Sequence, residues 1–394
     1  MSKGRIGIVG AGPGGMATAL AAIRLGYDVQ IFERACEIKP AGNILNLWPP
    51  PQKVLKLIGV DVSDLGAACH TVFANAKGKV RADVLLPPEV VSEYGGGFIG
   101  LLRWGLYKRM IEALPEGVLC LGHQVNGIED LGDRVRVDFA GQPSQEFDIL
   151  VGADGLHSFV RKWLWGDSPI RRQFLHLIGG YLFLDEEGPA EGVVAHDATT
   201  QFSYTPIRHE GKWGYEWWVL EAFKEDDPIP TDFMKFAKDR VTRFSPYLQS
   251  LVDQTPVEHM QRWEIRDRPP LKQWSKGRVT LVGDAAHPTS PYAAYGAGMS
   301  IEDGYFLARH LSSIDLKDTG QVRGALQAFE ERRKPHTATV TETAYKTGRM
   351  FHHLPKPLRP LRDFVFDKTP FLQKMIGNDT PKHILSQLAE IEDA

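Results

Sequence analysis

A short glycine-rich turn near the start of the chain constrains the fold more than any other feature. The turn reads Gly10-Ala11-Gly12-Pro13-Gly14-Gly15, and it lies between the β-branched run Arg5–Val9 and an Ala- and Leu-rich stretch over residues 13–25. This order predicts a strand, a tight turn and a helix, and an alternating apolar run over residues 28–32 adds a second strand. The resulting βαβ unit predicts an α/β fold with a parallel sheet at its centre.

The glycines of this turn have separate mechanical roles that together predict a dinucleotide site. Gly10 permits the tight turn, Gly12 lets the backbone approach a pyrophosphate at the positive end of the helix, and Gly15 lets helix and strand pack closely. Glu33 ends the second strand, where a carboxylate accepts a hydrogen bond from a ribose hydroxyl, and Arg34 follows it. We expect all five residues to contact a bound cofactor, but this motif does not distinguish FAD from NAD.

Composition places the chain among soluble, globular proteins. Of its 394 residues, 43% are hydrophobic and 24% are charged, which is enough to bury a large core and too polar for an integral membrane protein. The 46 basic and 49 acidic side chains give a net charge of −3 without runs of one sign, so neither a nucleic acid nor a membrane is expected as a partner. Three cysteines without metal-ligand spacing indicate a reducing cytoplasm, no metal site and no thiol chemistry.

The middle of the chain predicts a second kind of layer. Residues 179–223 are rich in aromatic and β-branched side chains, which predicts an antiparallel hairpin layer inserted between nucleotide-binding segments. Short apolar runs within residues 118–151 predict a meander that returns to the central sheet.

Helical periodicity dominates the rest of the chain. It extends over residues 232–252 and 321–349, where Pro335 either kinks one long helix or separates two. The tail from Pro355 onward mixes prolines with amphipathic segments, which predicts a packed terminal appendage.

Two further glycine and aspartate clusters accompany the first. One runs from Gly152-Ala153-Asp154-Gly155 to Arg161, and the other, Gly283-Asp284-Ala285-Ala286-His287-Pro288, ends a short buried strand. In order and spacing the three clusters resemble the three fingerprints of the class A FAD-dependent aromatic hydroxylases, the family of para-hydroxybenzoate and salicylate hydroxylases. The resemblance spans residues 5–335.

The resemblance implies a discontinuous two-domain fold. A Rossmann-like FAD-binding domain of the glutathione reductase type is expected to interleave with a smaller β-sheet substrate domain, and a helical segment is expected to follow. The expected boundaries are residues 1–68, 98–175 and 265–350 for the FAD-binding domain, 69–97 and 176–264 for the substrate domain, and 351–394 for the C-terminal helical appendage.

The resemblance also assigns cofactor contacts. Asp284 is expected to bind a ribityl hydroxyl, Arg103 the FAD phosphates, and Asp154 both FAD and the nicotinamide donor. As alternatives, Asp284 is a helix cap and Arg103 an ordinary surface arginine. The residues after Asp154 likewise either contact the cofactor or cap the following helix, namely His157, Ser158 and Arg161. No second glycine-rich βαβ unit is present, so NADH or NADPH is expected to bind transiently.

A further glycine-rich stretch is expected to border the flavin ring. Gly296, Ala297 and Gly298 open a helix, whose N-terminus the resemblance places at the N1 and C2 edge of the flavin, where partial positive charge stabilises the reduced ring. The family's Gly-Gln-Gly-x-Asn pattern is present at this stretch without its Gln and Asn side-chain amides. Near the flavin, Trp48 followed by three prolines replaces the family's Pro-Asn pair. Both departures argue against a standard small phenol as substrate.

Aromatic side chains with a period of two mark the expected substrate layer. Phe202 and Tyr204 share one strand face, and Tyr215 and Trp217 share a face of the next strand. These residues line a pocket for a flat ligand or form the core of the sheet. Three further residues are expected to contact the substrate, namely Trp48, Tyr181 and Phe183.

Together these features predict an FAD-dependent monooxygenase. By the resemblance, NADH or NADPH reduces FAD, O2 forms a C4a-hydroperoxide, and one oxygen atom enters an aromatic or polycyclic substrate. Pro291 is expected to face the reactive flavin edge, while Tyr292 and Tyr295 either bind and activate a substrate hydroxyl or simply pack. These three are the candidate catalytic residues of an enzyme expected to be a monomer or a homodimer.

Other outcomes of the same motifs stay open. Flavin chemistry of this type also gives epoxidation or Baeyer–Villiger insertion. A non-catalytic flavin-binding protein and an NAD-linked dehydrogenase are further alternatives, each distinguishable by NAD(P)H consumption and by the flavin spectrum. Halogenation is disfavoured, because residues 216–220 lack the Trp-x-Trp-x-Ile-Pro signature of halogenases with a related fold.

Overall fold

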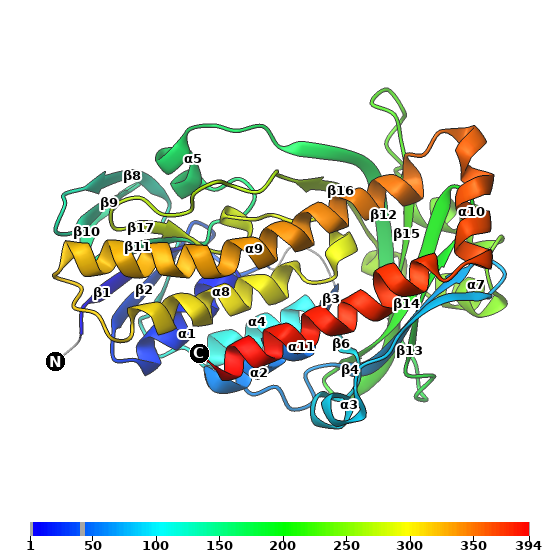
Figure 1. Ribbon diagram of the computed structural model, residues 1–394, viewed down its shortest axis with the longest axis horizontal. Coiled ribbons are helices and arrows are strands. Elements are labelled where there is room, and N and C mark those ends of the chain that lie inside the picture. The colour runs from blue at the N-terminus through cyan, green and yellow to red at the C-terminus, as the bar shows by residue number, and fades with distance from the viewer. Residues whose placement is uncertain (1–2, 40–43, 394) are drawn as a thin grey trace.

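Two sheets of different kinds lie side by side in this protein. The structure is a computed structural model that describes residues 3–39 and 44–393. A parallel sheet and its helices form one half, and a large mixed sheet forms the other (Figure 1). This arrangement confirms the predicted α/β fold class.

The parallel sheet begins with the predicted βαβ unit. Its strands follow the order β17-β11-β1-β2-β7, and each pair is parallel. The central strands are almost continuously apolar, because they are covered on both faces. The strands are β1 (Arg5–Val9), β2 (Asp28–Glu33), β7 (Leu119–Leu121), β11 (Ile149–Gly152) and β17 (Val279–Leu281).

Helices cover this sheet and pack closely on one another. A Cβ on Gly304 would lie 2.4 Å from the backbone nitrogen of Thr18, so two helices touch backbone to backbone at this point. A long helix continues through Pro335, so the segment is one helix and not two. Figure 1 shows it running beside α8. The helices are α1 (Pro13–Arg24), α4 (Arg103–Glu112), α5 (Phe159–Trp165), α8 (Gly296–Leu311) and α9 (Thr319–His352).

One predicted connection differs in the structure. The expected meander does not return as a whole to the central sheet. Its outer strands β7 and β11 join the parallel sheet, whereas the strands between them pair only with one another as a separate antiparallel sheet. Polar residues alternate with apolar ones along the middle strand of this sheet, residues 135–139, because one face meets solvent. The strands are β8 (Val125–Asp130), β9 (Val135–Phe139) and β10 (Gln142–Phe147).

The large sheet contains the predicted antiparallel hairpin. Strands β14 and β15 pair from end to end across the turn at Glu210 and Gly211. The sheet follows the order β16-β12-β15-β14-β13-β4-β6-β3, with β5 paired to β4. Its strands are β3 (Ile44–Leu47), β4 (Ala67–Asn75), β5 (Val80–Val84), β6 (Phe98–Leu102), β12 (Arg171–Phe183), β13 (Glu191–His196), β14 (Thr200–His209), β15 (Lys212–Ala222) and β16 (Gln261–Asp267).

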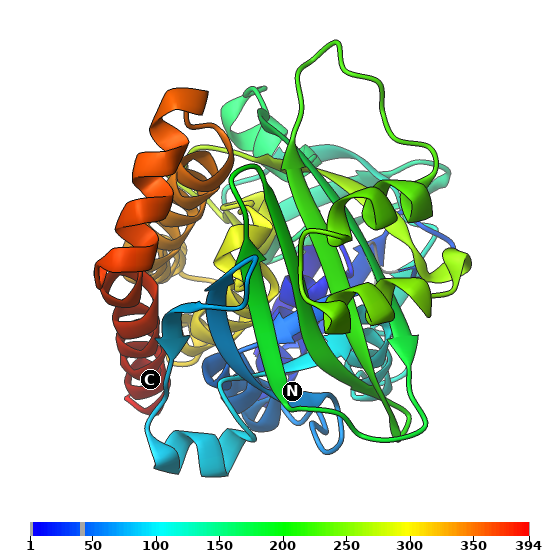
Figure 2. The same ribbon diagram turned by 90° about the vertical axis from the view of Figure 1, so that its right-hand side faces the viewer.

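Two short helices cover one face of the large sheet. The helical stretch expected over residues 232–252 is divided into α6 (Phe233–Val241) and α7 (Pro246–Asp253), because Ser245 caps a new helix that begins at Pro246. Figure 2 shows both helices lying across the near face of the sheet, with the parallel sheet behind it. We call the face under α6 and α7 the outer face and the opposite one the inner face.

The C-terminal segment is helical, as predicted. It contains α10 (Arg359–Lys368) and α11 (Asp379–Glu392), and α11 packs against α2 (Pro49–Leu57) near the start of the chain (Figure 1). A further short helix, α3 (Pro88–Tyr94), follows β5. Among the described helices, none has both the length and the apolar character that crossing a membrane requires.

Candidate active site

The three glycine and aspartate clusters meet at one edge of the parallel sheet. They follow β1, β11 and β17, which are neighbours in that sheet. The Ala153 N–H donates to the Val9 carbonyl over 2.8 Å, and the Val282 N–H donates to the Gly152 carbonyl over 3.0 Å. The carboxyl ends of parallel strands are where ligands bind in α/β sheets. The fold therefore brings distant segments of the chain to one potential binding site.

The first glycine turn leaves its ligand side open. Gly10 has φ of 105°, and a Cβ there would lie 2.5 Å from the Ala153 carbonyl oxygen. A Cβ on Gly15 would lie 2.0 Å from the Gly10 oxygen, so both positions require glycine. At Gly12, by contrast, the nearest atom to such a Cβ is 4.0 Å away, which leaves room for a phosphate group beside the backbone.

Glu33 supports this turn from the neighbouring strand. Its Oε2 accepts a hydrogen bond from the Ala11 N–H over 3.1 Å, and its Oε1 accepts one from Ala35 over 3.0 Å. The side chain is half-buried, and the neighbouring Arg34 is exposed. Glu33 therefore fixes the shape of the turn, and its expected contact with a ribose stays a prediction, as does that of Arg34.

Asp284 faces an interior space. The residue is accessible to solvent, yet protein surrounds its carboxyl group closely. Burial therefore raises the pKa of this carboxyl group, although the charges of His287, Arg103 and Arg161 act to lower that pKa. A side chain that is both accessible and surrounded lines a cavity. The nearby guanidinium groups of Arg103 and Arg161 suit this place to an anionic or hydroxyl-rich ligand.

Arg103 connects the third cluster with the large sheet. It is half-buried at the first position of α4, and its Nε donates to the Ile44 carbonyl over 3.3 Å. Its charge acts on Asp284 on one side and on Glu216 of β15 on the other. Arg103 is therefore an interior residue of the site, and the alternative of an ordinary surface arginine does not hold.

Asp154 caps its own helix. Its Oδ2 accepts from the backbone N–H groups of Phe159 and Val160, over 2.7 and 3.2 Å, and the Ser158 hydroxyl donates to Oδ1. Ser158 in turn accepts from the Arg161 N–H over 2.9 Å. Both oxygens of Asp154 therefore hold the start of α5, a structural role that had been expected only for the residues after it. The role of Asp154 toward a cofactor stays a prediction.

The N-terminus of α8 borders the same region. Gly296, Ala297 and Gly298 form its first turn, as expected for a glycine-rich helix opening. The loop before it contains the exposed Pro291, and the Trp48 indole donates to the Ala294 carbonyl over 3.0 Å. This bond ties the proline-rich start of α2 to the loop. A Cβ on Gly298 would lie 3.0 Å from the Pro51 side chain, so the two segments that depart from the family pattern also lie against each other.

A buried ionic cluster lies beneath α8. Arg333 of α9 donates to Asp303 over 2.7 Å and to Glu302 over 2.8 Å, and all three side chains are fully buried. Burial alone would raise the pKa of Asp303. The charges of His287 and Arg333 outweigh burial and lower this pKa to about 2. Asp303 also accepts from the backbone N–H of Gly283, which supports the third cluster from behind. No spacing in the sequence identifies this cluster, because Arg333 lies on α9 whereas Glu302 and Asp303 lie on α8.

Both candidate catalytic tyrosines use their hydroxyls within the protein. The Tyr295 hydroxyl donates to Glu302, and the Tyr292 hydroxyl donates to the Gln201 side chain over 2.7 Å and contacts His352. Burial raises the pKa of each phenol well above its ordinary value. The structure therefore favours the alternative in which these residues fix the Pro291 loop, and corrects the expectation that they activate a substrate hydroxyl.

Four of the seven aromatic residues expected at the substrate site lie in the core of the large sheet. Phe202, Tyr204, Tyr215 and Trp217 point to the outer face, where they pack with α6 and α7. The Trp217 indole donates to Thr255 over 2.7 Å, and the Tyr215 hydroxyl donates to the Pro189 carbonyl over 2.7 Å. These four residues form the sheet core, which was the alternative interpretation of their pattern. Their assignment to the substrate is corrected accordingly.

The inner face carries a different set of side chains. Because neighbours along a strand point to opposite faces, the residues between the aromatic ones lie here. Tyr181 and Phe183 of β12 are on this face and half-buried, as is Trp218 of β15. This face also carries buried polar side chains that were not predicted, although the same period of two identifies them: Gln201, Ser203, Thr205 and Glu216.

The residues around Arg103 fit an FAD molecule. Two buried polar atoms here make no hydrogen bond within the described chain, Asn46 Oδ1 on β3 and Thr289 Oγ1 before the Pro291 loop. Buried polar atoms in proteins are normally paired, so these indicate the place of a missing partner. The open backbone at Gly12, the cavity-facing Asp284 and the positive Arg103 complete a site for a long polar cofactor.

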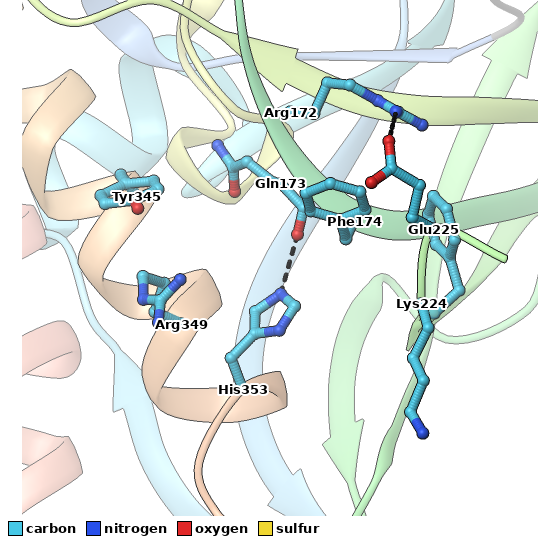
Figure 3. A pocket seen from close by; sticks show the side chains of 9 residues that line it. Arg172, Gln173, Phe174, Lys224, Glu225, Tyr345, Arg349 and His353 are labelled. Atoms are coloured by element: carbon cyan, nitrogen blue, oxygen red, sulfur yellow. Dashed lines mark hydrogen bonds and ion pairs between the residues drawn. The ribbon is translucent and has the colours of Figure 1, made fainter. Parts of the chain in front are cut away.

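A separate surface cleft lies at the end of α9. It has a volume of about 350 Å³, and Figure 3 shows charged side chains around it. The His353 ring donates to the Gln173 carbonyl over 2.8 Å, and Arg172 pairs with Glu225 over 3.2 Å. None of the predicted site residues lines this cleft, so it is distinct from the site at Asp284.

Comparisons with known proteins agree with this geometry. The family model described as an FAD binding domain matches residues 119–344. A 6-hydroxynicotinate 3-monooxygenase from Pseudomonas fluorescens is 31% identical over 329 residues, which cover 79% of this chain and 83% of the relative. A salicylate hydroxylase from Pseudomonas putida is 26% identical, over 88% of this chain and 86% of the relative.

Solved structures show the same fold. HpxO from Klebsiella pneumoniae, complexed with FAD and uric acid, superposes with a TM-score of 0.83 at 23% identity, covering 97% of both chains. The 2,6-dihydroxypyridine-3-hydroxylase of Arthrobacter nicotinovorans gives a TM-score of 0.75 at 18% identity, covering 89% of this chain and 93% of that one. The chain therefore belongs to the class A FAD-dependent aromatic hydroxylases and is an FAD-dependent monooxygenase.

Proposed function

We propose that this monooxygenase uses NADH or NADPH and O2 to insert one oxygen atom into a hydroxylated aromatic or polycyclic substrate. The substrate would lie between the inner face of the large sheet and the Pro291 loop. The observation that carries this proposal is the position of Arg103, whose charge reaches both Asp284 at the cofactor site and Glu216 on the inner face. Bound FAD would supply the transfer of electrons to O2 and of oxygen to the substrate.

The chain itself would hold the cofactor at three places. The backbone at Gly12 and the positive end of α1 would receive the pyrophosphate, with Arg103 as a second positive contact. Asp284 would accept from a ribityl hydroxyl. The N-terminus of α8 would lie at the ring, where its partial positive charge stabilises an anionic reduced flavin by about 0.3–1 kcal/mol.

The Pro291 loop would exclude water from the reacting atoms. Its shape is fixed by the Trp48 indole on Ala294 and by the hydrogen-bonded hydroxyls of Tyr292 and Tyr295. A dry site suppresses the loss of reducing equivalents as hydrogen peroxide. On the opposite side, Tyr181, Phe183 and Trp218 present partly exposed rings that suit a flat, electron-rich substrate.

Turnover of the purified flavoprotein with a substrate panel tests this proposal. We expect phenols, hydroxylated aromatic acids or hydroxylated heteroarenes to stimulate NAD(P)H oxidation and to give a product that contains one added oxygen atom. Mass spectrometry after reaction under 18O2 identifies that atom. If NAD(P)H is consumed and all of the oxygen appears as hydrogen peroxide with every aromatic compound, the proposed substrate class is wrong.

A further inference from the structure

Glu216 is a buried carboxyl group, and one of its oxygens makes no hydrogen bond within the described part of the chain. It lies in the middle of β15, directly opposite Thr205 on one neighbouring strand and Tyr181 on the other. Only 1% of the residue is exposed, and its Oε2 is wholly buried without a hydrogen bond to any described residue. A buried polar atom left unpaired is destabilising, so a partner that is not part of the chain is expected for Glu216 Oε2.

Its position places that partner at the active site. Glu216 points to the inner face, away from the aromatic core formed by its neighbours Tyr215 and Trp217. The charge of Arg103 acts on Glu216 and also on Asp284. The half-buried ring of Tyr181 lies beside it on the same face. The carboxyl group is therefore in the region where the proposed substrate lies.

Its surroundings favour the neutral form of the carboxyl group. Burial raises the pKa of Glu216 well above its ordinary value, and the charge of Arg103 opposes this shift without reversing it. The titratable groups near it are Arg103, which is charged, and, beyond Thr205, the thiol of Cys69, which stays neutral because burial raises its pKa to about 12. A neutral carboxyl group offers one donor and one acceptor side by side.

We propose that Glu216 recognises the substrate by pairing with a ring edge that carries a donor beside an acceptor. The N–H and C=O of a hydroxylated nitrogen heteroarene in its lactam form provide this edge. A phenol offers a single hydroxyl and would leave one carboxyl oxygen unpaired. This inference rests on the proposed function and narrows its substrate class.

Binding to the wild-type protein gives the first test. The probes are 6-hydroxynicotinate, its N-methyl lactam and 4-hydroxybenzoate, and the readout is the change in the absorbance of bound FAD on titration. Methylation removes the donor and leaves the ring and its carbonyl in place. We expect the N–H lactam to bind about tenfold more tightly than the N-methyl compound. Equal affinities, or no binding of the N–H lactam, would overturn the inference.

Two substitutions give the second test. Glu216→Gln keeps a neutral donor and acceptor, and we expect it to retain the preference for the N–H lactam within about threefold, whereas Glu216→Leu abolishes that preference. The matched control is Glu221→Gln on the same strand, whose carboxylate binds Arg240 away from the inner face. If Glu216→Gln abolishes the preference as fully as Glu216→Leu, charge and not the donor–acceptor pair is recognised, and the inference fails.

The design separates this inference from the proposed function. The ratio of bound FAD to protein shows whether each variant folds, and the wild-type comparison remains decisive if Glu216→Leu does not. Oxygenation of phenols without binding of any lactam refutes the inference and leaves the proposed function intact. Failure of every aromatic compound to be oxygenated refutes both.

Discussion

At the scale of single residues, Asp284 illustrates how environment decides the role of a carboxylate. It is accessible yet surrounded, and the guanidinium groups of Arg103 and Arg161 lie near it. Asp154 has an equally conspicuous place in its cluster, but its oxygens bind the start of α5. The two aspartates look alike in the sequence, but only the carboxylate of Asp284 remains accessible to a ligand, whereas that of Asp154 is used within the protein.

We predict that Asp284→Ala weakens FAD binding about tenfold or more, because a hydrogen bond between a carboxylate and a ribityl hydroxyl is lost. The measurement is the ratio of flavin to protein absorbance after gel filtration, followed by titration with FAD. Asp133→Ala is the control, since Asp133 is exposed and pairs with its neighbour Arg134. Unchanged occupancy in Asp284→Ala would contradict the assignment of the third cluster.

Arg333 carries a second prediction at this scale. Arg333→Met leaves Asp303 and Glu302 buried without their cation, so we expect the free energy of unfolding to fall by about 3–5 kcal/mol. The measurement is denaturant unfolding followed by circular dichroism. Arg332→Met serves as the control, because the adjacent Arg332 is partly exposed and its pair with Glu390 spans 3.8 Å. Similar losses of unfolding free energy in both variants would show that the buried cluster contributes no more to stability than the partly exposed pair.

At the scale of elements, the contact between α1 and α8 sets the geometry of the cofactor site. Gly304 lets the two helices touch, and Gly14 on α1 packs near the Ser300 carbonyl of α8, 3.2 Å from where its Cβ would be. The first and third clusters are held together by this pair of helices. Their separation is therefore sensitive to a single added methyl group.

We predict opposite effects for two glycine-to-alanine substitutions in helices. Gly304→Ala places a Cβ against the backbone of Thr18 and should lower the stability by about 1–3 kcal/mol. Gly324→Ala in α9 meets no atom within 4 Å and should raise it by about 0.5–1 kcal/mol, since alanine favours the helix. Thermal unfolding and bound FAD are measured for both. A loss of stability in Gly324→Ala, or none in Gly304→Ala, would refute the packing argument.

The large sheet provides a prediction that separates its two faces. Trp217→Phe removes a hydrogen bond from the outer core and should lower the melting temperature while leaving KM for an identified substrate within about twofold. Tyr181→Leu on the inner face should instead raise KM and the share of peroxide among the products, with a smaller effect on stability. Steady-state kinetics and product analysis distinguish the two. The reverse pattern would place the substrate on the outer face.

At the scale of the whole molecule, the site depends on segments that only the tertiary fold unites. Arg103 begins α4, Asp284 follows β17, Trp48 precedes α2, and Glu216 lies within β15. The C-terminal helix α11 packs against α2, so the end of the chain supports a segment that borders the Pro291 loop (Figure 1). The cofactor side and the substrate side thus belong to different sheets that are joined at Arg103.

The βαβ unit, the three clusters and the family were predictable from the sequence, because they rest on local patterns of glycine, aspartate and apolar residues. Gly10 and Gly15 show this well, since a steric requirement within a few residues fixes both. The antiparallel hairpin was predictable for the same reason. Its period of two identified two faces, and local pattern carries that much information.

Which face of the hairpin is covered by helices was decided only by the tertiary structure. Alternation along a strand is the same whichever side is covered, so nothing local distinguishes the face of Trp217 under α6 and α7 from the face of Glu216. The bonds of Tyr292 to Gln201 and of Arg333 to Asp303 likewise join residues far apart in the chain. Local sequence determines which conformations a segment adopts, whereas packing between segments determines which side chains remain free for chemistry.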